Sequence, residues 1–178
     1  FMIMPVGAPT FAEAIRYGAE VFAQIGKILK KRGFQTTVGD EGGYAPALGN
    51  NEAPLELMIE AIKACGYEPG RDICIALDPA STEFFINNKY DLATENLQIT
   101  SSEMVAKYSS WLEKDTIISI EDGLAEDDWA GWQEMTSKLG DRLQIVGDDL
   151  FVTNPARLAE GIEKKAGNSI LIKLNQIG

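Results

Sequence analysis

The stretch TIISIE (116–121) is a short apolar segment that ends in a carboxylate, and the chain repeats this arrangement several times. Charged residues close five such segments: Glu41, Asp78, Glu121, Asp148 and Lys173. Successive members lie 25 to 43 residues apart, which leaves room for a strand, a helix and two loops. If the segments are parallel strands, their ends meet at one edge of a sheet. We therefore predict that the five side chains gather there.

Helix-like segments separate these strand-like segments. Five stretches repeat apolar residues with helical spacing, and each opens at a residue that commonly caps or starts a helix. They begin at about Thr10, Pro54, Thr100, Asp128 and Asn154. Thr10 and Thr100 are each followed three positions later by a glutamate, which completes a capping box.

The strand-like segments are rich in Ile, Val and Leu, and they are apolar on both faces, as in parallel strands covered on both sides. They are Met2–Val6, Thr36–Val38, Ile73–Leu77, Thr116–Ile120, Leu143–Val146 and Ser169–Leu174. Their alternation with helices predicts βα units. Two β-like pieces about Asn87-Asn88 predict an inserted hairpin.

Two architectures fit this alternation, an open doubly wound sheet and a closed barrel. An open sheet collects its ligands at one switch point, whereas a barrel collects residues from the ends of many consecutive strands. Five functional-looking strand ends in a row favour an α/β barrel of the TIM type. A complete barrel has eight strands, so with six visible strands this one is expected to be incomplete in the chain.

Composition narrows the class of ligand. The chain of 178 residues has a net charge of −11, so direct nucleic-acid binding, which needs a cationic footprint, is not expected.

No apolar run reaches membrane-spanning length. Two cysteines, Cys65 and Cys74, are expected to be reduced thiols, as in a cytoplasmic protein. The chain starts within an element, at Phe1, as a piece of a longer protein would.

Asp78, Glu121 and Asp148 are hard oxygen ligands in a chain without histidine. Such a donor set disfavours zinc or copper and suits Mg²⁺ or Mn²⁺. Each residue alone is better explained as a helix cap or loop charge, but three at equivalent strand ends favour a metal site. Spacing alone leaves open whether Asp148 or Asp149, and whether Glu121 or Asp122, points inward.

Lys173 lies in the apolar segment ILIKL (170–174), which has no polar face to carry the ammonium to water. We expect it to face carboxylates, because an unpaired buried ammonium is costly. The alternative is a lysine that extends from the strand end to solvent. Close to bound Mg²⁺ its pKa is expected to fall, which would make it a base.

Glu41 lies in the glycine-rich segment GDEGG (39–43), which lacks the lysine and serine or threonine of a phosphate-binding loop. Glycines allow the backbone to turn sharply near a ligand. The functional interpretation of Glu41 is a general acid on a mobile loop, but without further context a plain acidic turn is the favoured alternative.

Several of these segments, in this order and spacing, resemble motifs of the enolase (phosphopyruvate hydratase) family. The segments are FMIMPVGA (1–8), VGDEGGYAP (38–46), LDPASTEF (77–84), SIEDGLAEDDW (119–129), VGDDLFVTN (146–154) and ILIKLNQIG (170–178). The resemblance covers the whole chain, and the form SIEDGL is more similar to bacterial than to animal members.

The resemblance implies a cytoplasmic glycolytic lyase, with a surface or secreted pool known for some members. It implies that Asp78, Glu121 and Asp148 bind Mg²⁺ and that 2-phosphoglycerate and phosphoenolpyruvate are the substrates. Lys173 would remove the α-proton of 2-phosphoglycerate and Glu41 would help the 3-hydroxyl leave, so both would touch substrate. A lysine base beside Mg²⁺ is the known chemistry of this superfamily. A homodimer or a ring of dimers is also implied.

The resemblance further implies that residues 1–178 are the central portion of the C-terminal barrel domain. The N-terminal domain and the last barrel units would be absent, and weak or no turnover is expected of this polypeptide alone. Two alternative functions remain. One is an acid-sugar dehydratase of the same superfamily, against which the GDEGG loop argues. The other is a metal-binding scaffold or interaction fragment without catalysis.

Overall fold

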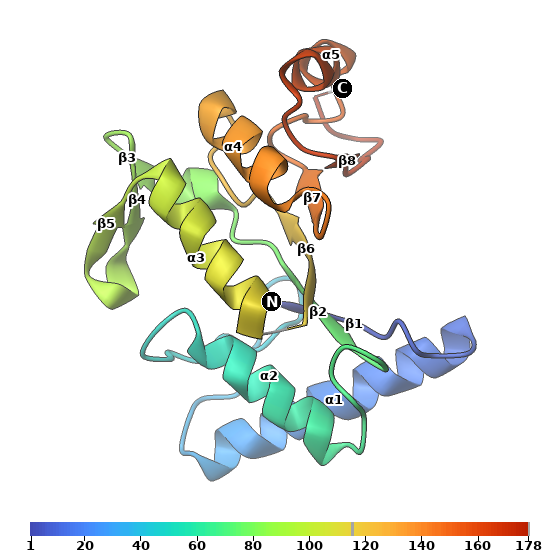
Figure 1. Cartoon of the computed structure of the whole chain (residues 1–178). Helices are drawn as coiled ribbons and strands as arrows, with labels where there is room; N and C mark the ends of the chain where they lie inside the picture. Colours follow the sequence, from blue (N-terminus) through green and yellow to red (C-terminus); the bar gives the residue numbers. More distant parts are fainter. Residues whose placement is uncertain (115, 178) are drawn as a thin grey trace. The chain divides into compact units, whose positions relative to one another are not determined.

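A computed structural model describes residues 1–114 and 116–177 (Figure 1). Its α-helices are α1 (Phe11–Lys31), α2 (Ala53–Ala64), α3 (Ser101–Lys114), α4 (Trp129–Leu139) and α5 (Pro155–Lys164). Its strands are β1 (Met2–Met4), β2 (Cys74–Leu77), β3 (Phe85–Ile86), β4 (Lys89–Leu92), β5 (Leu97–Ile99), β6 (Ile117–Glu121), β7 (Gln144–Gly147) and β8 (Ser169–Ile170). Two short 3₁₀ helices are η1 (Ser81–Phe84) and η2 (Ala93–Glu95).

The chain divides into two compact units, which are described separately. The smaller unit is Ile3–Ile75, and the larger comprises Phe1–Met2 and Ala76–Gly178. None of the helices within residues 1–114 and 116–177 has both the length and the apolarity needed to cross a membrane.

Side-chain caps confirm four of the five predicted helix starts, and α2 starts at Ala53, one residue before the predicted Pro54, without such a cap. The Thr10 hydroxyl accepts a hydrogen bond from the Glu13 N–H at 3.2 Å. Thr100 and Glu103 form the reciprocal capping box at the start of α3. Asp128 caps α4 and Asn154 caps α5 through their side-chain oxygens.

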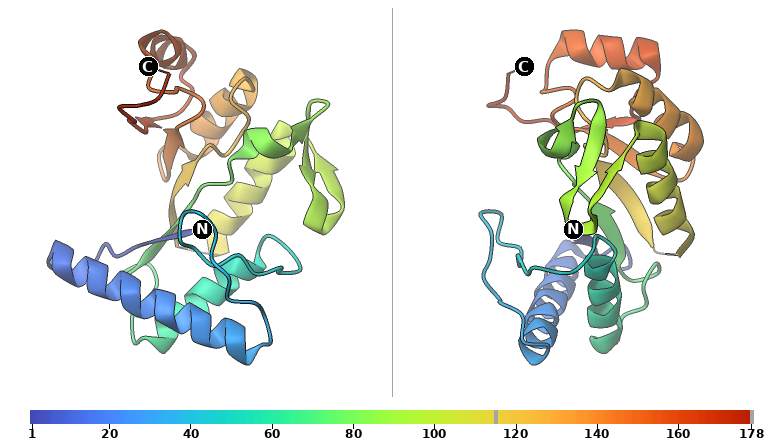
Figure 2. Two further views of the ribbon diagram at one scale, coloured as in Figure 1. Left: turned by 180° about the vertical axis from the view of Figure 1, so that it is seen from behind. Right: turned by 90° about the vertical axis from the view of Figure 1, so that its left-hand side faces the viewer.

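In the smaller unit, α1 and α2 pack side by side (Figure 2). Val21 and Leu29 of α1 and Ala61 and Ile62 of α2 are fully buried in their common core, together with Ile73. The burial of these apolar side chains is the main stabilising contribution to such a helix pair.

In the larger unit, β6, β7 and β8 are parallel neighbours. Glu121 at the end of β6 is in register with Val146 of β7. The carboxyl ends of the strands therefore meet at one edge, as predicted for Glu121 and Asp148. Helices α3 and α4 pack on each other and bury large aromatic side chains, including Tyr108, Trp111 and Trp132.

The hairpin predicted about Asn87-Asn88 is confirmed. β3 and β4 pair antiparallel, and both asparagines have positive φ, 51° and 59°, as a tight hairpin turn requires. β5 extends the pair to a three-stranded sheet that the sequence did not predict.

Two predicted strands are wrong in extent. Thr36–Val38 forms only an isolated antiparallel bridge between Val38 and Tyr44, because the Gly39–Gly43 turn folds the segment back on itself. The predicted strand Ser169–Leu174 ends at Ile170, apart from one further hydrogen bond from the Leu171 N–H to the Gly147 carbonyl.

Candidate metal and proton-transfer site

Carboxylates gather at the ends of β2, β6 and β7, all within the larger unit. Asp78, Glu121 and Asp122 each offer an oxygen within 4.8 Å of the others, and so do Asp122, Asp148 and Asp149. The predicted metal ligands are thus divided between two groups that share Asp122. Asp122 and Asp148 are buried, with exposed fractions of 4% and 6%.

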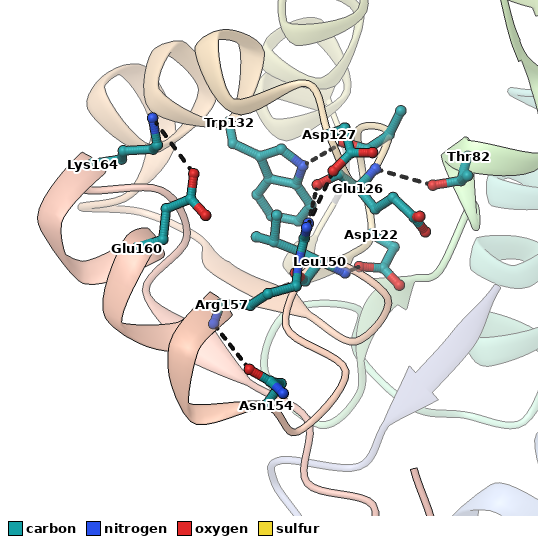
Figure 3. A network of polar contacts seen from close by, with 11 residues as sticks. Thr82, Asp122, Glu126, Asp127, Trp132, Leu150, Asn154, Arg157, Glu160 and Lys164 are labelled. Carbon is teal, nitrogen blue, oxygen red and sulfur yellow. Dashed lines mark hydrogen bonds and ion pairs between the residues drawn. The ribbon is translucent and has the colours of Figure 1, made fainter. Parts of the chain in front are cut away.

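Asp122 connects three strand ends through hydrogen bonds. Its Oδ1 accepts from the backbone N–H of Asp148 at 3.0 Å, and its Oδ2 accepts from that of Asp149 at 2.8 Å. The Leu150 N–H lies 3.5 Å from Oδ1 (Figure 3). The Asp122 N–H donates to the Val146 carbonyl, and the Asp122 carbonyl accepts from the Ser81 N–H.

Asp148 is the ion-pair partner of Lys173. The Lys173 ammonium contacts Oδ2 of Asp148, while Oδ1 accepts a hydrogen bond of 2.9 Å from the Gln176 side-chain amide. The Thr153 hydroxyl donates to Gln176 and accepts from the Lys173 backbone N–H, each at 2.9 Å. The segment after β8 is therefore attached to the loop after β7.

Lys173 faces a carboxylate, as expected, but the structure corrects the burial that its apolar surroundings predicted. Its side chain is 50% exposed, because β8 ends three residues earlier and the segment runs out into a loop. Its hydrogen bond and charge interaction with Asp148 raise the pKa of the ammonium. With protein groups alone, Lys173 therefore holds its proton.

The acidic side chains raise one another's pKa. Burial raises the pKa of Glu121 to about 7, and the charges of Asp78, Asp148 and Asp122 add to the shift, against the opposing charge of Lys173. Burial likewise raises the pKa of Asp122 to about 6, although its backbone N–H donors oppose the shift. Such crowding is relieved when a cation binds.

Strained backbone surrounds these groups. Ala80, Asp122, Val152 and Thr153 all adopt positive φ between 41° and 57°. The left-handed region is unfavourable for side chains with a Cβ, and most of all for β-branched residues such as Val152 and Thr153. Strain of this kind persists only where surrounding contacts over-determine the loop.

Arg157 of α5 holds the same loops from outside (Figure 3). Its guanidinium donates to the carbonyls of Leu150 and Glu126, each at 2.5 Å, and to the Asp127 carboxylate at 3.2 Å. It also lies over the Trp129 ring, 5.0 Å from the centroid. One cation therefore joins the loop after β6 to the loop after β7.

Glu41 belongs to the smaller unit, within a turn closed by two backbone hydrogen bonds. The Gly39 N–H donates to the Gly43 carbonyl, and the Gly42 N–H donates to the Gly39 carbonyl. Every residue from 31 to 43 is exposed, Glu41 included. The turn that the glycines predict is present, and the role of Glu41 as an acid stays a prediction.

The donor set fits a hard divalent cation. All of the members of both groups are carboxylates, and Mg²⁺ and Mn²⁺ prefer oxygen ligands. The two oxygens of Asp148 are already engaged by Lys173 and Gln176, yet a carboxylate has further lone pairs for a cation.

Sequence reasoning did not assign roles to Asp122, Gln176, Thr153 or Arg157. Asp122 was recognised only as a neighbour of Glu121, and Gln176 lies in the ILIKLNQIG segment that was singled out for Lys173. Arg157 gave no signal, because two of its partners are backbone carbonyls, whose positions depend on the fold.

Comparison with known protein families gives a match to the family described as enolase, C-terminal TIM barrel domain, over residues 1–178. This match confirms the predicted barrel fold. The described residues contribute five strands to βα units (β1, β2, β6, β7 and β8), fewer than the eight of a complete barrel. The barrel is therefore incomplete in the part of the chain that the structure describes.

Proposed function

The chain belongs to the enolase C-terminal barrel family, and we propose that it carries the reaction centre of a Mg²⁺-dependent hydro-lyase. The proposed reaction interconverts 2-phosphoglycerate and phosphoenolpyruvate. The observation that carries the proposal is the contact of Lys173 with Asp148 beside the carboxylates of Glu121 and Asp78. A base next to an oxygen-rich cation site suits removal of a proton from the carbon beside a substrate carboxylate.

Asp78, Glu121 and Asp148 would hold the cation, and Asp122 and Asp149 lie beside them in the same two groups of carboxylates. When bound, the cation supplies positive charge that stabilises the second negative charge developing on the substrate carboxylate. The bound cation would also offset the negative charge of the carboxylates that raises the pKa of Lys173. That pKa would therefore fall, and the lysine could act as a base.

Lys173 would take the α-proton, and its Asp148 and Thr153 contacts would orient the ammonium and its backbone. Glu41 would give a proton to the departing hydroxyl, so that water leaves. Its exposed glycine-rich turn is free of the packing that would fix it, which suits an acid that adjusts to the substrate. Proton removal and proton donation would thus fall to residues from different loops.

The decisive experiment is α-proton exchange. The longest natural form of the protein that contains these residues is incubated with 2-phosphoglycerate and Mg²⁺ in D₂O, and deuterium incorporation is followed by NMR. Lys173→Ala is expected to lower the exchange rate by roughly 10²- to 10⁴-fold. Lys30→Ala, on an exposed turn of α1, is the matched control and should exchange normally.

Exchange that is unchanged in Lys173→Ala would refute the role of the lysine. A wild-type protein that binds Mg²⁺ but neither exchanges nor dehydrates 2-phosphoglycerate would instead favour the scaffold function. Dehydration of acid sugars in place of 2-phosphoglycerate would favour the second superfamily reaction.

The family match also supports finer proposals about context. We expect a homodimer or a higher homo-oligomer, a cytoplasmic location and a role in glycolysis. Analytical ultracentrifugation tests the first, and fractionation of the source cells tests the second.

A further inference from the structure

Asp122 belongs to both acidic groups, yet its carboxylate is already used differently from those of its neighbours. Both of its oxygens face backbone N–H groups of the loop after β7, at 3.0 Å for Asp148 and 2.8 Å for Asp149. A carboxylate that accepts N–H donors from successive residues fixes their backbone, because each bond is charge-assisted and directional.

The main chain of Asp122 adds two more connections. Its N–H donates to the Val146 carbonyl at 3.0 Å, and its carbonyl accepts from the Ser81 N–H at 3.1 Å. Ser81 follows Asp78 by three residues, and the Asp78 carboxylate accepts from the Ala80 N–H between them. Asp122 therefore reaches the backbone that carries each of the other two proposed ligand positions and is itself adjacent to Glu121.

The conformation of Asp122 is costly, which indicates that these contacts determine it. Its φ is 41°, and the residue is 4% exposed. An aspartate in the left-handed region, buried among other acids, is stable only if its hydrogen bonds offset the strain and the desolvation.

We propose that Asp122 is a positioning residue, whose carboxylate clamps the N–H groups of Asp148 and Asp149 and so sets the spacing of the cation ligands Asp78, Glu121 and Asp148. The clamp itself follows from the contacts, and its effect on cation binding rests on the proposed function. Asp122 acts through the backbone of its neighbours and is not itself a ligand. Replacement of such an outer partner lowers metal affinity by roughly 10- to 100-fold.

The test measures two quantities in the full chain of each variant. Amide hydrogen exchange at residues 148–150, in the absence of divalent cations, reports the clamp. Mn²⁺ affinity, from calorimetry and from the EPR signal of free Mn²⁺, reports ligand spacing. Asp122→Asn is nearly isosteric but replaces one accepting oxygen by an N–H donor.

Asp122→Asn is expected to speed exchange at residues 148–150 and to weaken Mn²⁺ binding by roughly 10- to 100-fold. Glu121→Gln should weaken Mn²⁺ binding while leaving that exchange unchanged, as a direct ligand would. Asp141→Asn is the control of matched chemistry on an exposed residue and should alter neither quantity. Leu139→Ala, in the core, should lower stability without altering Mn²⁺ affinity, which separates positioning from general destabilisation.

Unchanged exchange in a folded Asp122→Asn protein would refute the clamp. Faster exchange with unchanged Mn²⁺ affinity would refute its effect on spacing, and lost affinity with unchanged exchange would make Asp122 a ligand instead. A wild-type protein that binds no Mn²⁺ would refute the proposed function. Amide hydrogen exchange at residues 148–150 would still test whether the clamp exists.

If Asp122→Asn does not fold, the clamp is tested in the wild-type protein alone. Scalar couplings through hydrogen bonds, from the amide nitrogens of Asp148 and Asp149 to the carboxyl carbon of Asp122, are expected by NMR. Their absence would refute the clamp.

Discussion

Residues 148–153 and residues 39–43 each carry a carboxylate of the proposed site, Asp148 and Glu41, and the two loops differ in what holds them. The first loop is held by side chains from elsewhere in the larger unit, above all Asp122 and Arg157. The second is closed by backbone hydrogen bonds of its own, and residues 38–43 are exposed.

This difference separates two tasks within one proposed reaction. Groups that share a cation must be held at fixed spacing before it binds, so their loop is packed and cross-linked. A proton donor must follow the leaving group, so a loop with few fixed contacts is suitable. Four substitutions or conditions test the contrast, from the largest expected effect to the smallest.

Arg157→Ala should lower the free energy of unfolding by about 3 kcal/mol. The change leaves the carbonyls of Leu150 and Glu126 without their charged donor, and bonds to charged groups contribute about 1.5–3 kcal/mol each. Urea denaturation measures the loss. Arg142→Ala, which removes an exposed ion pair with Glu113, is the control and should cost less than about 1 kcal/mol. Equal losses in the two variants would contradict the cross-linked loop.

Gly147→Ala should cost about 2 kcal/mol, because the added methyl group has no room. A Cβ at Gly147 would lie 2.5 Å from the Phe151 ring and 3.1 Å from Cβ of Leu150. Gly49→Ala places its methyl group in open space and should change stability by less than about 0.5 kcal/mol. Thermal unfolding of the pair gives the comparison, and a neutral Gly147→Ala would mean that the loop after β7 adjusts freely.

Without divalent cations, stability should fall as the pH rises from about 4.5 to about 7. Over this range the folded state keeps Glu121 protonated, because its pKa is raised to about 7, whereas the unfolded state has released that proton. Wild type and Glu121→Gln are compared by urea denaturation at several pH values. The difference should be about 1 kcal/mol after allowance for solvent screening. Parallel pH profiles would contradict the raised pKa.

Gly42→Ala should cost about 1 kcal/mol. Its φ of +82° is unfavourable for alanine, but a Cβ there meets nothing within 4 Å and the exposed turn can adjust. Hydrogen exchange of residues 39–43 should be fast in both wild type and variant. A loss of stability above about 2 kcal/mol would mean that residues 39–43 are packed as tightly as the loop after β7, which would contradict the difference between the two loops.

The sequence predicted the helices and the inserted hairpin well, because their signals are local. Caps at Thr10, Thr100 and Asn154 depend on neighbouring residues alone. It also predicted that Glu121 and Asp148 share a sheet edge, since a charged residue marks where each apolar segment ends.

What the sequence could not predict depends on contacts between distant residues. Lys173 was expected to be buried because Ile172 and Leu174 are apolar, yet both are exposed, as is Lys173 itself. The side-chain amide of Gln176 and the guanidinium of Arg157 find partners 28 and 31 residues away, respectively. Spacing likewise could not decide between Glu121 and Asp122, because both lie in the site and only their contacts distinguish them.

The Asp122 carboxylate accepts hydrogen bonds from the main-chain N–H groups of residues 148–150, and the side chains of these residues take no part in them. Any residue that has a backbone N–H can therefore make this connection from position 149 or 150, and a proline substitution there would remove the donor.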